Sequence, residues 1–400
     1  GLPEPVQVVQ RQAVLALEWL YETGAGDTPT PDLAARLAAA VDPAHYRIDL
    51  RRAPLIRAVA VHDAARQRWL LQLPSHHLVL DHTTLALLIE EITLIQQGRD
   101  SELPAPVPFR RYVAQARLGV SQAEHEAFFR RMLGDVDEPT APFGLLDVQG
   151  NGTRVQEARR RLDLPLAQRL RRLAQRHGVS AASLFHLAWA LVLGKTTGKD
   201  DVVFGTVLFG RMQGGEEAGR ALGLFINTLP LRVRLGGRSV AACVRDTQAT
   251  LTGLLHHEHA KLSLAQRCSA LPGGVPLFSA LLNYRYSPEA DAPEDAAAAA
   301  AWAGMESLGG EERTNYPFGL SVDDLGEGFE LVAQIHETVD AQRICGLMLA
   351  ALPGLAEALD TQPAQPVCEL GLLGPAERET LQAWGARRAC FDPTVPVHRL

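Results

Sequence analysis

The most informative stretch of this 400-residue sequence is Ser75-His76-His77-Leu78-Val79-Leu80-Asp81-His82. Before it, positions 54–63 and 68–73 are apolar with β-branched and aromatic members, which predicts an antiparallel strand pair. After it, apolar residues recur at helical spacing up to Gly98, with Thr83 or Thr84 available as N-cap. The two histidines are therefore expected in a turn between a strand and a buried helix.

The residue types in this turn suit proton transfer. Histidine accepts and returns a proton near neutral pH, because its unperturbed pKa is about 6.5. Adjacent side chains at a strand end point to different sides, so we expect one catalytic histidine and one that braces the turn. Asp81, four residues after His77, can fix the turn by charge-assisted hydrogen bonds. The local pattern also allows two structural histidines near a helix cap.

The rest of the chain mixes helices and strands, so the fold class is α/β (α+β). We predict helices at 109–118, 122–133, 165–177, 180–193, 240–259 and 341–359. We predict further strands at 201–209, 228–234, 279–286 and 329–337. Residues 134–153 read as a loop and a second lobe is expected to begin near residue 160, while the polar, Pro-rich residues 361–366 are typical of an interdomain linker.

Composition narrows the class of protein. The net charge of −7 is mild for this length and predicts no nucleic-acid partner. Five cysteines lack Cys-x-x-Cys spacing, which argues against zinc and disulfides and fits a cytoplasmic protein. No apolar run approaches the roughly 20 residues that span a bilayer, so no membrane association is expected. The Ala-rich residues 288–301 are expected to form a mobile surface loop.

Several motifs, in order along the chain, resemble those of condensation domains of nonribosomal peptide synthetases. Residues 76–81 match the family's His-His-x-x-x-Asp-Gly motif, with His82 in place of the glycine. Other segments that resemble family motifs are residues 48–58, 109–112, 200–206, 210–211 and 223–232. The resemblance covers residues 1 to about 365, and residues 370–400 are similar to the segment that joins a condensation domain to an adenylation domain.

The resemblance implies two chloramphenicol-acetyltransferase-like lobes that form a V-shaped pseudo-dimer. Residues 1–160 would be the N-terminal lobe with its start missing, residues 161–365 the C-terminal lobe, and residues 366–400 the linker and the beginning of an adenylation domain. Upstream (donor) and downstream (acceptor) peptidyl carrier domains would bring thioesters on phosphopantetheine arms. No metal and no directly bound cofactor is implied.

The resemblance also implies roles for single residues. His77 would orient or deprotonate the acceptor amine, with His76 beside it, and Asp81 would hold the turn against an arginine. The family's usual candidate for that arginine lies in a motif before residue 1, so this partner is not named. His82, Asn283 and Tyr284 are candidates for the substrate channel. The alternatives are that His82 caps the helix and that Tyr284 is ordinary core.

The same resemblance leaves subtypes to distinguish. His82, residues 137–144 and residues 256–259 resemble the dual epimerisation/condensation subtype, which inverts the donor residue before joining it. The alternatives are an epimerisation-only domain and a catalytically silent docking module of the same fold. Cyclisation domains carry aspartates at both histidine positions, which excludes them. The one- and two-residue spacing in 257–259 disfavours a metal site and favours a solvated or lobe-contacting helix end.

Overall fold

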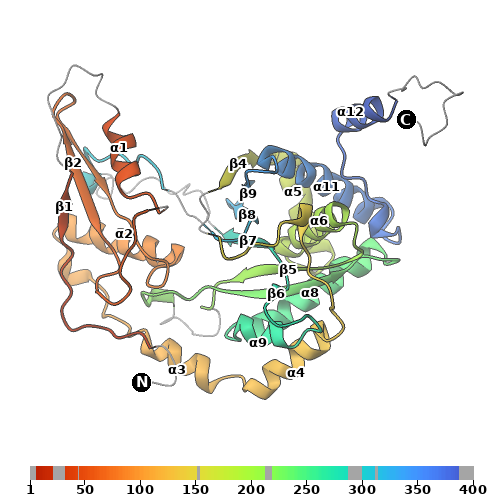
Figure 1. Cartoon of the computed structure of the whole chain (residues 1–400), viewed down its shortest axis with the longest axis horizontal. Coiled ribbons are helices and arrows are strands. Elements are labelled where there is room, and N and C mark those ends of the chain that lie inside the picture. The colour runs from red at the N-terminus through yellow and green to blue at the C-terminus, as the bar shows by residue number, and fades with distance from the viewer. Residues whose placement is uncertain are drawn as a thin grey trace, which may run out of the picture.

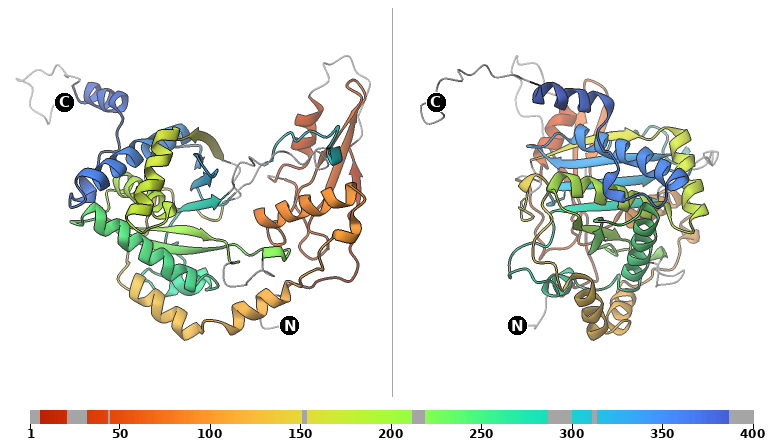
Figure 2. Two further views of the ribbon diagram at one scale, coloured as in Figure 1. Left: turned by 180° about the vertical axis from the view of Figure 1, so that it is seen from behind. Right: turned by 90° about the vertical axis from the view of Figure 1, so that its right-hand side faces the viewer.

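The structure is a computed structural model that describes residues 6–20, 32–43, 45–150, 154–211, 219–286, 300–310 and 314–386. Two lobes lie side by side, and helices α3 and α4 run along the edge where they are joined (Figures 1 and 2). The predicted mixture of helices and strands in two lobes is confirmed. We call the lobe around the small sheet the N-lobe and the lobe around the large sheet the C-lobe.

The N-lobe is built on a three-stranded sheet of order β1-β2-β3. Its strands are β1 (Leu17–Trp19), β2 (Ala58–Asp63) and β3 (Arg68–Gln72). Strands β2 and β3 are antiparallel, as predicted, whereas the parallel strand β1 was not predicted. Helix α1 (Leu33–Ala40), also unpredicted, packs with β2 and β3 around a small apolar cluster.

The face of this sheet opposite α1 is apolar and exposed. Trp19 and Trp69 meet edge to face at a centroid distance of 5.3 Å. They are 47% and 61% exposed, and the neighbouring Leu17 and Leu71 are 45% and 58% exposed. Contiguous apolar side chains in contact with water are unusual on a soluble surface.

Helix α2 (His82–Gln96) follows the histidine turn, and η1 (Asp100–Glu102) comes after it. The predictions that Thr83, Thr84 or His82 caps α2 are wrong. The N-cap is Asp81, whose carboxylate accepts a hydrogen bond from the Thr84 N–H and satisfies one of the unpaired donors of the first turn. His82 is the first residue of the helix and is exposed.

The C-lobe is built on a six-stranded sheet of order β4-β9-β8-β7-β5-β6. The strands are β4 (Val155–Arg161), β5 (Asp201–Leu208), β6 (Asn227–Arg234), β7 (Ala280–Tyr286), β8 (Phe318–Asp324) and β9 (Phe329–His336). Strand β7 pairs in parallel with β5 and β8, and the other pairs are antiparallel. Four of these strands were predicted, but β4 and β8 were not.

Helices cover one face of this sheet (Figure 1). They are α5 (Leu164–Arg176), α6 (Ala181–Thr197), α8 (Val240–His256) and α11 (Ala341–Thr361). Helix α6 is buried on nearly every side, as its all-round apolar sequence predicts, and its Trp189 is completely buried. The helices form one layer on this face, and the opposite face of the sheet is turned toward the N-lobe (Figure 1).

Helix α4 (Gln122–Leu133) belongs by its packing to the C-lobe. It follows α3 (Arg110–Leu118) in the connection from the N-lobe, and both agree with the predicted helices. Phe129 and Leu133 of α4 are completely buried in the C-lobe core, and α4 contacts α9 (Leu262–Arg267). Between α4 and β4, the described part of the predicted loop, residues 134–150, contains the short η2 (Pro142–Gly144) and an isolated bridge from Thr140 to Phe278.

By length and composition α11 would suffice to cross a membrane, contrary to the expectation that no apolar run is long enough. Its apolar face, which includes Ile344, Met348 and Leu355, is completely buried in the C-lobe core, so α11 is a core helix. The segment after it, predicted as a linker, also packs on this lobe through η3 (Val367–Glu369), where Val367 is completely buried. Helix α12 (Pro375–Gly385) follows.

Two parts of the C-lobe reach the N-lobe. The ends of β5 and β6 extend toward α2 (Figure 1), and residues 300–310 contact the N-lobe. There the Trp302 indole N–H donates to the Thr93 hydroxyl of α2 at 2.8 Å. Most of the Ala-rich segment predicted as a loop, residues 287–299, lies outside the described residues.

Candidate active site

The histidine turn is fixed to the strand pair by its backbone. The His76 N–H donates to the Leu55 carbonyl at 2.9 Å, and Ser75 forms an isolated antiparallel β-bridge with Ile56. The His76 side chain is half-buried, and its Nδ1 accepts from the Leu78 N–H at 3.1 Å. Burial and the neighbouring His77 lower the pKa of His76. His76 is therefore a neutral ring that braces the turn, with its proton on Nε2.

His77 has the opposite tautomer. Its ring is exposed, and its Nδ1 lies 2.7 Å from the Leu80 carbonyl oxygen. Because a carbonyl oxygen only accepts, Nδ1 carries the proton and the lone pair of the neutral ring is on Nε2. The two neighbouring rings therefore carry their protons on different nitrogens, Nε2 in His76 and Nδ1 in His77.

Asp81 links the histidine turn to the C-lobe. Its side chain is 2% exposed and accepts from the Thr84 N–H at 2.7 Å, which caps α2. Its Oδ1 is 3.1 Å from Nη2 of Arg211, and its Oδ2 accepts from the Phe225 N–H at 3.0 Å. One buried carboxylate therefore fixes the start of α2 and binds two segments of the other lobe.

Arg211 is the arginine partner that the sequence left unnamed. It follows Gly210 just after β5, and its side chain is 10% exposed. Nη2 also donates to the Thr84 hydroxyl at 3.0 Å, and the guanidinium lies 3.8 Å from the centre of the Phe225 ring. The Gly-Arg pair at 210–211 was visible as a motif, but only the fold shows that it faces Asp81.

Thr84 makes a second bond across the lobes. Its hydroxyl donates to the Gly223 carbonyl at 2.7 Å and accepts from the Gly223 N–H at 3.1 Å. Gly223 has a φ of +151°, and a Cβ there would lie 2.4 Å from the Phe109 ring. A glycine is therefore required where this segment crosses to α2.

The two strand candidates lie on opposite faces of the C-lobe sheet. Tyr284 packs with Phe185 on the helix-covered face, and its hydroxyl donates to Asp324 at 2.5 Å. Burial and that carboxylate raise its pKa. Side chains alternate along a strand, so Asn283 points to the face turned toward the N-lobe. Tyr284 thus has core contacts, whereas Asn283 lies on the opposite face of the sheet.

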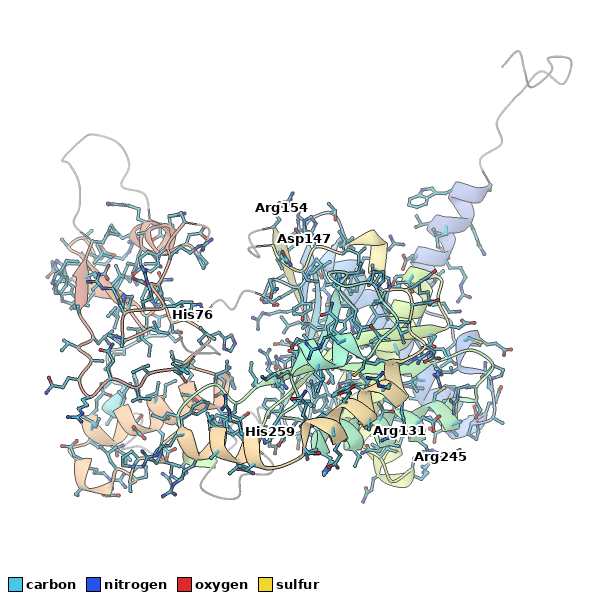
Figure 3. The ribbon with its side chains drawn as sticks, turned by 60° about the horizontal axis from the view of Figure 1, so that its bottom comes forward. His76, Arg131, Asp147, Arg154, Arg245 and His259 are labelled. Atoms are coloured by element: carbon cyan, nitrogen blue, oxygen red, sulfur yellow. The ribbon has the colours of Figure 1, made fainter. Side chains whose placement is uncertain are left out.

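The residues that follow His256 at the end of α8 pack against α4. His257 stacks on Phe128 at 4.2 Å and its Nδ1 lies 2.9 Å from Nδ1 of His125, whereas the side chain of His256 is 59% exposed. Figure 3 shows His259 near the junction of the lobes and His76 on the part of the N-lobe that faces the C-lobe. Within the described residues, no group of three or more His, Cys, Asp or Glu side chains could hold a metal ion.

The four described cysteines, at 243, 268, 345 and 368, are free thiols, and Cys390 lies outside the described residues. Three of the four are buried. Burial raises the pKa of Cys243 to about 11, and it also raises the pKa of Cys268 and Cys345. These three thiols are therefore protonated at neutral pH and make poor nucleophiles.

Comparison with known proteins identifies relatives of this chain. The chain is 46% identical over its whole length to part of malpinin synthetase and 45% identical to part of malpibaldin synthetase, both from Mortierella alpina. It spans about 5% and 7% of the length of these relatives.

Among solved structures, the first condensation domain of the CDA synthetase aligns with a TM-score of 0.63 at 21% identity. The alignment covers 90% of this chain and 78% of that one, which shows a shared fold. A sequence model of the condensation-domain family matches residues 2–382. With its two lobes and its His-His-Asp turn, the chain belongs to the condensation-domain family, the amide-bond-forming acyltransferases of nonribosomal peptide synthetases.

Proposed function

We propose that the chain joins a donor aminoacyl or peptidyl thioester to the amine of an acceptor aminoacyl thioester, with His77 as the proton acceptor. The observation that carries this proposal is the tautomer of His77, whose Nδ1–H is held by the Leu80 carbonyl. That bond leaves the basic lone pair on Nε2 of an exposed ring. Both substrates would arrive on the phosphopantetheine arms of carrier domains.

One base is sufficient for the proton transfers of this aminolysis. The acceptor amine attacks the thioester carbonyl, a C–N bond forms, and the nitrogen loses a proton to Nε2 of His77. The C–S bond then breaks, and the departing thiolate receives that proton. Positioned general bases of this kind contribute about 10²–10⁴-fold to a rate. His76 and Asp81 hold the turn that carries this ring.

We further propose that the donor residue is epimerised before condensation. Support comes from His82, residues 137–144 and residues 256–259, which resemble the dual subtype. A base at Nε2 of His77 suits this reaction too, because the thioester carbonyl acidifies the adjacent Cα–H. Asn283 and the exposed His82 would line the channel, and Tyr284 would support it through Asp324.

The organisation of the larger protein is also proposed from the resemblance. Donor and acceptor carrier domains would dock from opposite faces, and an adenylation domain would follow residues 366–400. Residues 1–160 and 161–365 would correspond to the two lobes, although α4 and β4 before residue 160 already pack in the C-lobe. Free thiols at the four described cysteines suit a cytoplasmic location.

The test is a reconstituted reaction between loaded donor and acceptor carrier proteins, with the chain supplied together with its native neighbouring domains. His77→Ala should lower the rate of dipeptidyl-thioester formation by about 10²–10⁴-fold. His45→Ala, a change at another exposed histidine, is the matched control and should leave the rate unchanged. Condensation by His77→Ala at the wild-type rate would show that the catalytic assignment of His77 is wrong, whereas a wild-type chain that forms no product would support the catalytically silent docking module.

Epimerisation is tested by the same reaction run in D₂O with an L-configured donor. Exchange at the donor Cα and a D-configured product are expected. A product that keeps the L-configuration and gains no deuterium would exclude the dual activity. Cα exchange without any condensation would identify an epimerisation-only domain.

A further inference from the structure

Phe225 is the residue through which the C-lobe holds Asp81. It is 1% exposed, and its N–H donates to Oδ2 of Asp81 at 3.0 Å. Its ring contacts Arg211, the other partner of that carboxylate, at 3.8 Å. A shift of the Phe225 backbone would therefore alter both C-lobe contacts of Asp81 at once.

Tyr112 of α3 holds the carbonyl end of the same residue. Its hydroxyl donates to the Phe225 carbonyl at 3.2 Å, and the two rings lie 4.4 Å apart. Burial, followed by the charge of Glu258, raises the pKa of Tyr112 to about 12. The hydroxyl is thus protonated at neutral pH and can donate continuously.

The fit around this bond is close. A Cβ at Gly210 would lie 2.1 Å from the Phe225 carbonyl oxygen and 3.1 Å from the Tyr112 hydroxyl. Gly210 also has a φ of +65°, in the left-handed region that favours glycine. The bond between Tyr112 and Phe225 therefore occupies a site that has no room for a side chain at position 210.

Behind Tyr112 lie a buried imidazole and a buried carboxylate. Nδ1 of His259 is 3.4 Å from the Tyr112 hydroxyl, and its Nε2 is 3.8 Å from Oε1 of Glu258. The side chains of His259 and Glu258 are 8% and 0% exposed. Since Tyr112 donates its proton to Phe225, its oxygen is the acceptor for an Nδ1–H of His259.

The charges of this pair are linked. Burial, followed by the charge of His125, lowers the pKa of His259, which favours a neutral ring. With Nδ1 protonated, the Nε2 lone pair faces the carboxyl group of Glu258 at 3.8 Å, so the protonation of the two groups is coupled. The turn that carries His259 and Glu258 is held at the start of β6 by Asn227. The side-chain amide of Asn227 donates to the carbonyls of Glu258 and Ala260 at 2.8 and 2.7 Å.

We propose that Tyr112, His259 and Glu258 form a positioning relay that fixes the Phe225 backbone and, through it, Asp81 and the catalytic turn. None of the three touches the reacting atoms. Their task is to hold the Tyr112 hydroxyl in the orientation that donates to Phe225. The catalytic consequence of this relay rests on the proposed function of His77, but its structural consequence does not.

The experiment reads the Phe225 amide directly by hydrogen exchange on the whole chain. Tyr112→Phe keeps the ring that packs on Phe225 and removes only the hydroxyl, whereas Glu258→Gln keeps the volume and removes the carboxylate. Each should speed exchange at Phe225, by about tenfold for Tyr112→Phe, the effect of one lost hydrogen bond. Exchange in the core helix α11 should not change, which separates local loosening from global unfolding.

Tyr46→Phe is the matched control, because Tyr46 packs on the separate N-lobe cluster, and it should leave Phe225 exchange at the wild-type rate. The relay is wrong if either Tyr112→Phe or Glu258→Gln exchanges Phe225 within twofold of wild type. In the reconstituted reaction, both variants should lower kcat and leave the KM for the loaded carriers unchanged. If His77 is not the catalytic base, the kinetic effect will be absent but the change in exchange will remain. A failure of the proposed function can therefore be told apart from a failure of the relay.

Discussion

The guanidinium of Arg211 in the C-lobe lies 3.1 Å from the carboxylate of Asp81 in the N-lobe, and the two side chains are 10% and 2% exposed. Removal of one member of such a pair leaves an uncompensated buried charge. We expect Asp81→Ala to lower the free energy of unfolding by about 3–5 kcal/mol. Denaturant unfolding of the purified chain measures this loss.

The matched comparison is the double variant Asp81→Asn with Arg211→Met, which removes both charges. Each single change, Asp81→Asn or Arg211→Met, leaves the other side chain charged and buried without its partner, but the double variant does not. The double variant should therefore lose less stability than the sum of the two single losses. Additive losses would contradict the proposed direct coupling. Arg211→Lys should fall between wild type and Arg211→Met, since lysine keeps the charge but loses the planar stack on Phe225.

His76 and His77 should differ in what their loss affects. His77 is exposed, so His77→Ala should change the free energy of unfolding by less than about 0.5 kcal/mol while the reaction rate collapses. His76 is half-buried and accepts from the Leu78 N–H, so His76→Ala should cost about 1–2 kcal/mol. Thermal unfolding and the condensation assay, run on the same preparations, separate the two roles.

Gly210 should not tolerate a side chain. Gly210→Ala would place a methyl group 2.1 Å from the Phe225 carbonyl oxygen and strain a left-handed backbone. We expect a loss of at least about 1–2 kcal/mol together with fast exchange at the Phe225 amide. Gly237→Ala is the control, because Gly237 has a similar φ of +63° but open space around its Cβ position. Equal effects of the two changes would show that backbone strain alone is responsible.

Stability should fall as the solution is acidified. Burial, followed by His125 and His256, lowers the pKa of His257 from 6.5 to about 4. As the pH falls, the unfolded chain binds this proton before the folded one does, so the contribution is complete above pH 6.5 and is lost progressively toward pH 4. The expected loss from this residue is on the order of 2 kcal/mol.

Unfolding by urea at a series of pH values between 7 and 4 measures that loss. His257→Gln should reduce the dependence on pH over this interval, since glutamine does not titrate. His45→Gln, at an exposed position, should keep the wild-type dependence. A steeper dependence in His257→Gln would show that the sign of the argument is wrong.

The exposed apolar face of the N-lobe sheet should bind hydrophobic probes. Trp69 and Leu71 on β3 are 61% and 58% exposed and lie beside Trp19. We expect the chain to bind a fluorescent apolar dye and to self-associate at high concentration. Leu71→Lys should reduce both effects, whereas Leu118→Lys, a change at an isolated exposed leucine of α3, should not.

The sequence predicts the local parts of this site well. Apolar periodicity identified α4, α6 and α11, because burial of one face or of the whole helix explains each pattern. It also identified α2, but the prediction that α2 is buried is wrong, since its Leu85, Ile89, Ile92 and Ile95 are exposed. Strand β1 and helix α1 were not predicted, because three and eight residues are too short to show a clear apolar periodicity. Strand β4 was missed because its run of charged residues hides its alternation at the edge of the sheet.

The parts that depend on long-range pairing could not be predicted. Asp81 and Arg211 are 130 positions apart, and nothing local to either residue indicates the other. Tyr112 and His259 are 147 positions apart and meet only because α3 crosses beneath the turn after α8. The choice of Asp81 over Thr83 or Thr84 as N-cap was likewise obscured, because each of these residue types can cap a helix.

The shared use of Asp81 limits how the lobes can move. Its carboxylate starts α2 and also holds Arg211 and Phe225, so a displacement between the lobes at this point would break the cap and the bridge together. Any rotation that keeps these bonds must turn about an axis that passes close to Asp81. Points far from that axis can then travel many ångströms, while His77, four residues away in the chain, stays at a nearly constant distance from the C-lobe. Wide motion at the outer ends of the lobes is thereby compatible with a fixed position of His77 relative to the C-lobe.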